Sequence, residues 1–113
     1  MSRDDVYLEH ILYAIVKIES YTTVGQAQFF AESHWQDGVI RQLEIIGEAT
    51  KRLSPDLRKR HPEVAWRRMA GLRDVLIHNY MGVDLDNVWD VTQEAVPELK
   101  KSIVAILDAE HTS

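Results

Sequence analysis

The sequence contains no cysteine, which excludes disulfide bonds and metal sites built on thiolates. It also lacks any apolar run close to the roughly 18 residues that a membrane-spanning helix needs. The first ten residues, MSRDDVYLEH, show no basic segment followed by an apolar one, so they do not resemble a secretory signal. From these absences we expect a soluble, cytoplasmic protein without a membrane contact.

Metal-binding patterns and strand patterns are absent as well. The five histidines are scattered, and neither HExxH nor a cluster of His, Asp and Glu at ligand spacing occurs. We therefore expect no metal and no cofactor. No alternating apolar pattern or hairpin signal predicts a strand. A chain of 113 residues has room for one core, so we expect a single domain over residues 1–113.

Apolar residues recur at helical spacing along most of the chain. Principal helices are predicted at residues 2–22, 37–53, 64–80 and 84–107. Short accessory helices are predicted near residues 26–35 and after Ser54–Pro55, an N-cap followed by a first-turn proline. The last helix keeps one apolar phase across Pro97, which indicates one kinked helix rather than two. The predicted fold class is all-α, an up-and-down bundle of four principal helices.

The charge is unevenly distributed along the chain. Residues 51–73 carry eight basic side chains against two acidic ones, a net of +6, whereas the whole chain has a net charge of −5. A local positive field would attract a ligand that bears phosphate, although a solvated basic surface is the simpler alternative. The candidates for binding RNA are Lys51, Arg58, Lys59, Arg60, Arg67 and Arg68.

The stretch RDVLIHNY, residues 73–80, places polar side chains inside an apolar helical run. Asp74 and His78 are four residues apart and share a helix face, so the carboxylate can orient the imidazole. Arg73 and His78 are five apart, about 140° around a helix axis, which is poor geometry for gripping one small group. Either the length of the arginine or a second copy across a twofold axis would bring them together.

The side chains of this stretch suit chemistry on a phosphodiester. A histidine can transfer protons near neutral pH, and an arginine offers a permanently charged fork that matches a phosphate. Together they suit attack of an RNA 2′-hydroxyl on its own phosphodiester, a reaction that needs no metal. A structural pair at a surface or an interface is the alternative for Asp74 and His78. Composition and spacing alone therefore predict a helical bundle with a candidate phosphate site.

At these residues the chain resembles a known family. The pattern R-x4-H-x-Y in RDVLIHNY is similar to the signature of the HepT-like toxins of the HEPN superfamily. Further segments resemble that family in order and spacing, and the likeness covers about residues 8–107. They are LEHILYAIVKIESYT, VIRQLEIIGEATKRLS, HPEVAWRRMAGLRDVLIHNY and VDLDNVWDVTQEAVPELK.

The resemblance implies an all-α bundle that forms a homodimer with the two motifs facing each other. It implies a metal-independent endoribonuclease, the toxin of a bacterial or archaeal toxin–antitoxin pair, with Arg73 and His78 as the catalytic pair and Asp74 supporting them. It further implies a partner, a minimal nucleotidyltransferase antitoxin that transfers AMP to Tyr80. Added phosphates there would place negative charge beside Arg73 and His78 and block an RNA phosphate. At position 74 this chain has aspartate, Asp74, where many members of that family have asparagine.

Two other classes of function stay open from the sequence. The bundle could be a non-catalytic module that binds a nucleotide or its nucleotidyltransferase, with Tyr80 as a modification acceptor. It could also be a purely structural dimerising bundle. Three tryptophans, Trp35, Trp66 and Trp89, are predicted to lie in the core or at a dimer interface, with base stacking as the alternative.

Overall fold

A computed structural model describes residues 3–72 and 84–112, and both ranges are helical without any strand. The long helices are α1 (Asp4–Thr22), α3 (Ser33–Arg52) and α8 (Val96–Thr112). The short elements are α2 (Gln26–Ala31), α4 (Pro55–Arg60), α5 (Trp66–Ala70), α7 (Leu85–Asp90) and the π-helix η1 (Val91–Ala95). The prediction of an all-α fold is confirmed.

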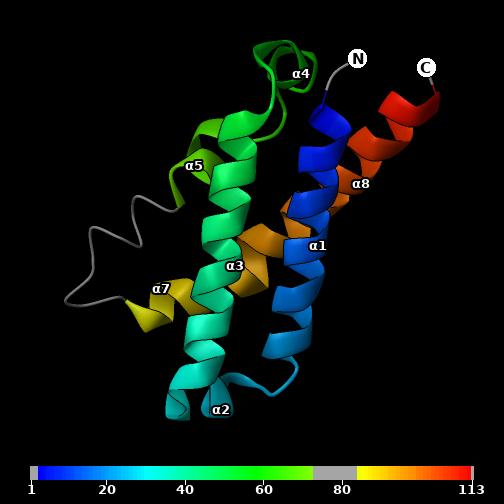
Figure 1. The fold of residues 1–113 in the computed structure, drawn as a ribbon. Coiled ribbons are helices and arrows are strands. Elements are labelled where there is room, and N and C mark those ends of the chain that lie inside the picture. Colours follow the sequence, from blue (N-terminus) through cyan, green and yellow to red (C-terminus); the bar gives the residue numbers. More distant parts are fainter. Residues whose placement is uncertain (1–2, 73–83, 113) are drawn as a thin grey trace.

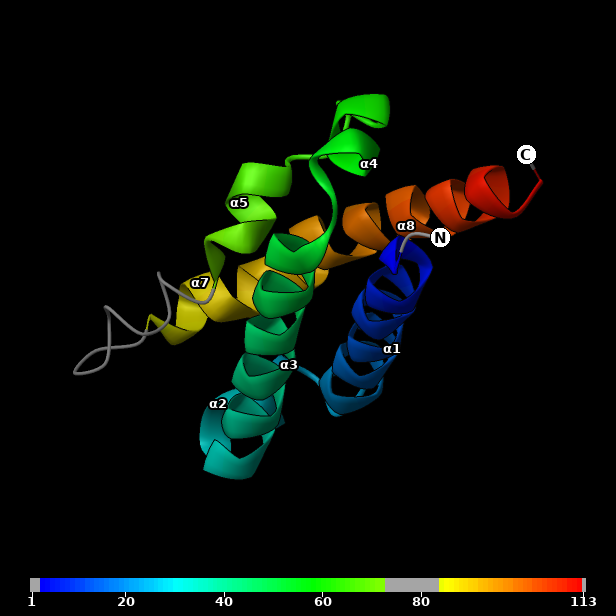
Figure 2. The same cartoon turned by 45° about the horizontal axis from the view of Figure 1, so that its top comes forward.

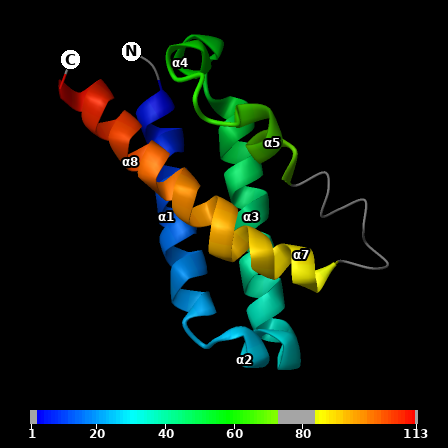
Figure 3. The same cartoon turned by 180° about the vertical axis from the view of Figure 1, so that it is seen from behind.

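Three long helical segments form the body of the molecule. α1 and α3 lie side by side and run in opposite directions (Figure 1). The continuous run of α7, η1 and α8 crosses obliquely behind both of them (Figures 2 and 3). α5 packs beside α3, and α2 lies at the end of the bundle opposite α4 (Figure 1). Within the described ranges, no helix has the length and apolar character needed to cross a membrane.

The core lies where the apolar faces of these helices meet. Ile11, Ile15 and Ile18 of α1 and Ile46 of α3 have no exposed surface. Full burial of one such side chain contributes about 1.5–3 kcal/mol relative to leaving it in water. In the helices predicted over residues 2–22, 37–53 and 84–107, the apolar residues at helical spacing are buried or half-buried as expected, the buried ones including Leu8, Val39, Leu43, Ala49, Val88, Leu99, Ile103 and Ile106.

The chain between α2 and α3 differs from the prediction. The predicted short helix reached His34 and Trp35, whereas α2 ends at Ala31 and α3 already begins at Ser33. The turn takes a single extended residue, Glu32, whose carboxylate accepts a hydrogen bond from the indole Nε1 of Trp35 at 2.6 Å. Such side-chain contacts hold the first turn of α3, and a pattern of apolar residues does not report them.

The described part of the helix predicted over residues 64–80 also differs from the prediction. Its first described part, α5, begins at Trp66 rather than Val64 and ends at Ala70, with Gly71 as its C-cap. The indole Nε1 of Trp66 donates to the carbonyl oxygen of His61 at 2.8 Å, which fixes the turn before the helix. The rest of that prediction falls outside the described residues.

The last helix is continuous across Pro97, in agreement with its single apolar phase. It begins at the predicted N-cap, Asp84, whose carboxylate accepts from the backbone N–H of Asn87 at 3.2 Å. Its irregularity is η1, where the N–H of Val96 bonds the carbonyl oxygen of Val91, five residues back. A proline ring crowds the carbonyl of the preceding turn, and the wider π turn directly before Pro97 relieves that crowding.

Candidate functional site

The residues predicted for catalysis and modification, Arg73, Asp74, His78 and Tyr80, lie outside the described residues. The structure does describe the segments of the chain that precede and follow them. Before the motif, Trp66 and Met69 of α5 are buried, and Leu72 packs against the core. After it, Val88 of α7 is buried. Both flanks of the motif are therefore anchored in the core.

The two flanking helices lie on the same side of the bundle. α5 and α7 are both found on the α3 side, away from α1, when the molecule is viewed from the front and from behind (Figures 1 and 3). The ring of Trp89 in α7 lies 5.1 Å from that of Phe29 in α2, which ties this helix to the lower end of the bundle. Trp66 is a core residue, as predicted, and Trp35 and Trp89 are half-buried against the core.

The predicted RNA-binding side chains lie at the C-terminal end of α3 and on α4 and α5, and the structure separates them by environment. Lys51, Lys59, Arg67 and Arg68 are exposed, whereas Arg58 is half-buried. The Nε of Arg58 is buried without a hydrogen-bond partner among the described atoms. The exposed members present their positive charge to solvent.

Arg60 has a structural contact instead. Its guanidinium lies 2.6 Å from a carboxylate oxygen of Glu110 in α8, and the other oxygen is 3.4 Å from the Nε2 of His61. Hydrogen bonding from Arg60, with a further bond from His61, lowers the pKa of Glu110 despite the opposing effect of desolvation. Arg60 therefore links α4 to α8, which makes it the weakest candidate of the six for binding RNA.

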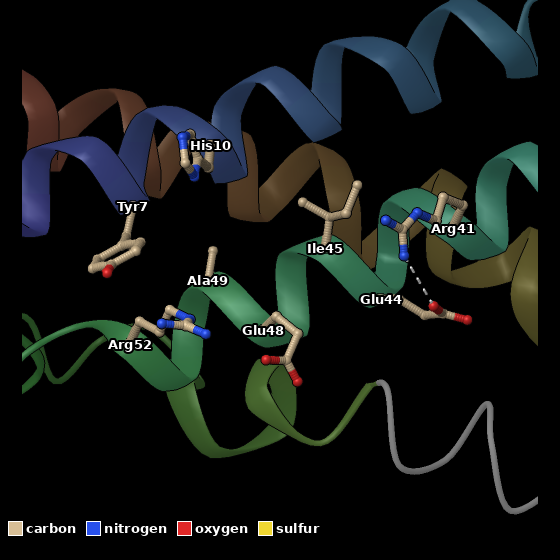
Figure 4. Close-up of a pocket in the computed structure, with 8 residues that line it drawn as sticks. All are labelled: Tyr7, His10, Arg41, Glu44, Ile45, Glu48, Ala49 and Arg52. Atoms are coloured by element: carbon tan, nitrogen blue, oxygen red, sulfur yellow. Dashed lines mark ion pairs between the residues drawn. The ribbon is translucent and has the colours of Figure 1, made fainter.

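A groove between α1 and α3 was not predicted from the sequence. Its volume is about 520 Å³, and it is lined by Tyr7, His10, Arg41, Glu44, Ile45, Glu48, Ala49 and Arg52 (Figure 4). On α3, Arg41, Ile45, Glu48 and Arg52 follow the spacing i, i+4, i+7 and i+11, which puts them on one face. That spacing is visible in the sequence, but the pairing of this face with Tyr7 and His10 is not.

In the described part of the chain, no group of three His, Asp or Glu side chains has the arrangement needed to hold a metal ion. The acidic side chains of the groove, Glu44 and Glu48, are accompanied there by Arg41 and Arg52. The chemistry that these residues offer is therefore hydrogen bonding, charge and aromatic contact.

The described residues form an all-α domain, and in the sequence the R-x4-H-x-Y stretch lies between α5 and α7. Residues 11–106 match the family described as Ribonuclease HepT-like. The chain belongs to this family, within the HEPN superfamily.

Proteins with related sequences carry names that refer to ribonucleases. The chain is 46% identical over 95 residues to "Probable ribonuclease HepT" of Thermococcus cleftensis, covering 83% of this chain and 86% of that protein. It is 39% identical over 105 residues to "Putative RNase TTE0752" of Caldanaerobacter subterraneus subsp. tengcongensis, covering 92% and 94%.

One relative is a longer protein. The chain is 42% identical over 104 residues to "Gamma-glutamylcyclotransferase and putative RNase MJ0434" of Methanocaldococcus jannaschii. That match covers 91% of this chain but only 47% of the relative, so the chain spans about half of its length. No solved structure shows a significant match to the chain.

Proposed function

We propose that this chain is a metal-independent endoribonuclease whose catalytic pair is Arg73 and His78. The observation that carries the proposal is the stretch RDVLIHNY, an R-x4-H-x-Y pattern, inside a chain that belongs to the HepT-like family. His78 transfers the proton of the 2′-hydroxyl or of the leaving oxygen, and Arg73 neutralises charge on the phosphate. Asp74 orients His78. The ribonuclease names of the relatives support the same reaction class.

The described structure supports this proposal through the surroundings of the motif. Buried side chains anchor the chain before and after residues 73–83, so both ends of the stretch are held by the core. Exposed cations, Lys51, Lys59, Arg67 and Arg68, lie on the helices that lead into it. A strand of RNA that approaches the motif would thus meet positive charge on α3, α4 and α5.

The catalytic site is proposed to be composite, with a homodimer bringing two motifs together. If residues 73–80 form one straight helix, side chains five residues apart, such as Arg73 and His78, would point about 140° apart. An arginine of one copy beside a histidine of the other would bracket a phosphate more closely than either copy alone. Residues 1–113 would act as one domain in this assembly.

The biological role proposed is that of the toxin in a toxin–antitoxin pair of a bacterial or archaeal cytoplasm. Its partner would be a minimal nucleotidyltransferase that transfers AMP to Tyr80. A phosphate on Tyr80 adds negative charge two residues from His78, which repels the phosphates of RNA. This regulation requires no change in the rest of the fold.

The experiment compares RNA cleavage in EDTA by the unmodified protein, by His78→Ala and by His34→Ala as a matched histidine control. His34 has a largely exposed side chain, 67% of it accessible, at the start of α3. We expect cleavage to leave 2′,3′-cyclic phosphates and to fall about 100-fold or more in His78→Ala only. Cleavage that survives in His78→Ala would contradict the catalytic assignment. Absence of cleavage by unmodified dimer would instead favour the non-catalytic binding module.

A further inference from the structure

The groove between α1 and α3 has the size and shape of a ligand site. Its volume of about 520 Å³ lies within the range of roughly 300–1,000 Å³ that small-molecule sites occupy. The two helices that form it pack against each other and contribute several side chains of no exposure to the core. A site on such helices is held in place before a ligand arrives.

Two aromatic rings and an apolar floor favour a flat ligand. The rings of Tyr7 and His10, one turn apart on α1, have centroids 6.2 Å apart and planes at 80°. They therefore form two adjoining walls at nearly a right angle. Ile45 and Ala49 of α3 line the same groove, and both pack in or against the core. A planar heterocycle can stack on one ring while its edge meets the other.

The charged side chains of the groove are not equivalent. Arg41 lies 3.6 Å from Glu44, so much of its charge is balanced within α3. Arg52 stands at the other end and forms no ion pair with any residue of the described ranges. The Tyr7 side chain reaches from α1 toward this end of α3 (Figure 4). The groove thus offers an aromatic surface and, beside it, an exposed cation.

We propose that this groove binds one nucleotide unit, with the base stacked on Tyr7 or His10 and the phosphate on Arg52. An aromatic face recognises any base, and a neighbouring arginine supplies the charge for its phosphate. The carboxylate of Glu44, which lies 3.6 Å from Arg41, can accept a further hydrogen bond from a base. Guanine, adenine and cytosine each offer an amino group, whereas uracil offers only its ring N3–H, so a uracil nucleotide should bind less tightly.

The nucleotide can come from either of two sources with the same chemistry. It can be a free mononucleotide, or it can be an unpaired nucleotide within a strand of RNA. In the second case the groove is a subsite outside the R-x4-H motif, and this case rests on the proposed ribonuclease function. A paired base would be unable to enter, because its face is covered by its neighbours in the helix.

The test measures binding at equilibrium rather than cleavage, so it is independent of the catalytic proposal. The full chain is titrated with 5′-GMP, with 5′-UMP, and with a short single-stranded RNA and its duplex, by calorimetry or NMR. The variants are Tyr7→Leu, which keeps apolar bulk, and Arg52→Gln. Lys101→Gln is the matched control, since it removes an exposed positive charge on α8 outside the groove and outside the candidate RNA-binding residues.

We expect Tyr7→Leu and Arg52→Gln each to weaken binding about tenfold and Lys101→Gln to change it less than about twofold. Loss of affinity for 5′-GMP assigns the site to free nucleotides, and loss confined to single-stranded RNA assigns it to the strand. Equal losses in Arg52→Gln and Lys101→Gln, or no effect of Tyr7→Leu, would overturn the proposal. Absence of binding by every probe would overturn it too.

The same titration on His78→Ala separates the two proposals. If the groove binds a nucleotide, that variant retains its affinity for 5′-GMP even when it no longer cleaves RNA. A chain that cleaves RNA but shows no dependence on Tyr7 retains its ribonuclease function and lacks the subsite. A chain that binds nucleotides without cleaving RNA has the subsite and lacks the reaction.

Discussion

The α1–α3 pair and the α4–α5 segment (residues 55–70) are joined to the rest of the molecule in different ways. Between α1 and α3 the contacts are apolar, and Ile11, Ile15 and Ile46 have no exposed surface. The α4–α5 segment buries a few apolar residues, but charged and polar groups join it to both ends of the described chain. The region that leads into the motif is therefore more sensitive to pH and salt than the scaffold behind it.

At the N-terminal side this link is a buried carboxylate. Asp4 accepts hydrogen bonds from the backbone N–H of Ser54 at 2.8 Å and from its hydroxyl at 2.6 Å. The same hydroxyl oxygen accepts from the N–H of Leu57 and caps α4. At the C-terminal side the link is the cluster of Arg60, His61 and Glu110. The first link depends on two side chains and the second on three.

The largest effect is expected in the scaffold. Ile15→Ala removes a side chain of no exposure and leaves a cavity between α1 and α3, so the free energy of unfolding should fall by about 2–5 kcal/mol. Chemical denaturation measures this change. Val16→Ala is the matched control, because Val16 is 47% exposed and should cost no more than about 0.5 kcal/mol. Similar losses in both variants would contradict the described packing of α1.

A smaller effect is expected at the polar link between α1 and α4. Ser54→Ala deletes the cap of α4 and one of the two hydrogen bonds that Ser54 donates to the buried Asp4. The free energy of unfolding should fall by about 1–3 kcal/mol. Ser102→Ala on α8, away from any cap, serves as the comparison in the same denaturation experiment. An unchanged midpoint in Ser54→Ala would mean that water replaces the hydroxyl without loss.

The smallest effect is expected at Glu110 and depends on pH. Its pKa is lowered in the folded state, first by the hydrogen bond from Arg60, relative to an ordinary value of 4.5. The stabilisation is therefore present above pH 4.5 and is lost as the pH falls through the lower folded-state pKa. Melting temperatures of the wild type and Glu110→Gln should differ near neutral pH and converge in acid. A difference that stays constant down to pH 3 would contradict this assignment.

Apolar periodicity was enough to predict the long helices of the scaffold, because a buried helix face requires apolar residues at regular helical spacing. Residues such as Leu43 and Ile103, chosen for their spacing, are buried. The early start of α3 was missed because it depends on Glu32 and Trp35, whose contact is a matter of side-chain geometry. Apolar periodicity therefore predicted which helix faces are buried better than it predicted where the helices begin and end.

The candidate sites also differ in whether the sequence alone could reveal them. The R-x4-H-x-Y motif is contiguous, so sequence alone was enough to select Arg73 and His78 as candidates. The groove brings residues 7 and 10 beside residues 41–52, and that pairing depends on how two helices pack. The contact of Arg60 with Glu110, fifty residues away, was likewise not predicted. Distant pairs of this kind have no local pattern.

The π turn of η1 holds one more residue than an α-helical turn would need. Deleting a single exposed residue there, such as Gln93, would restore a regular α-helix and rotate everything N-terminal to it by about 100° relative to α8. Trp89 would then leave its contact with Phe29, and Asp84 would face another direction. The extra residue of η1 therefore determines the direction in which α7 and Asp84 face relative to α8.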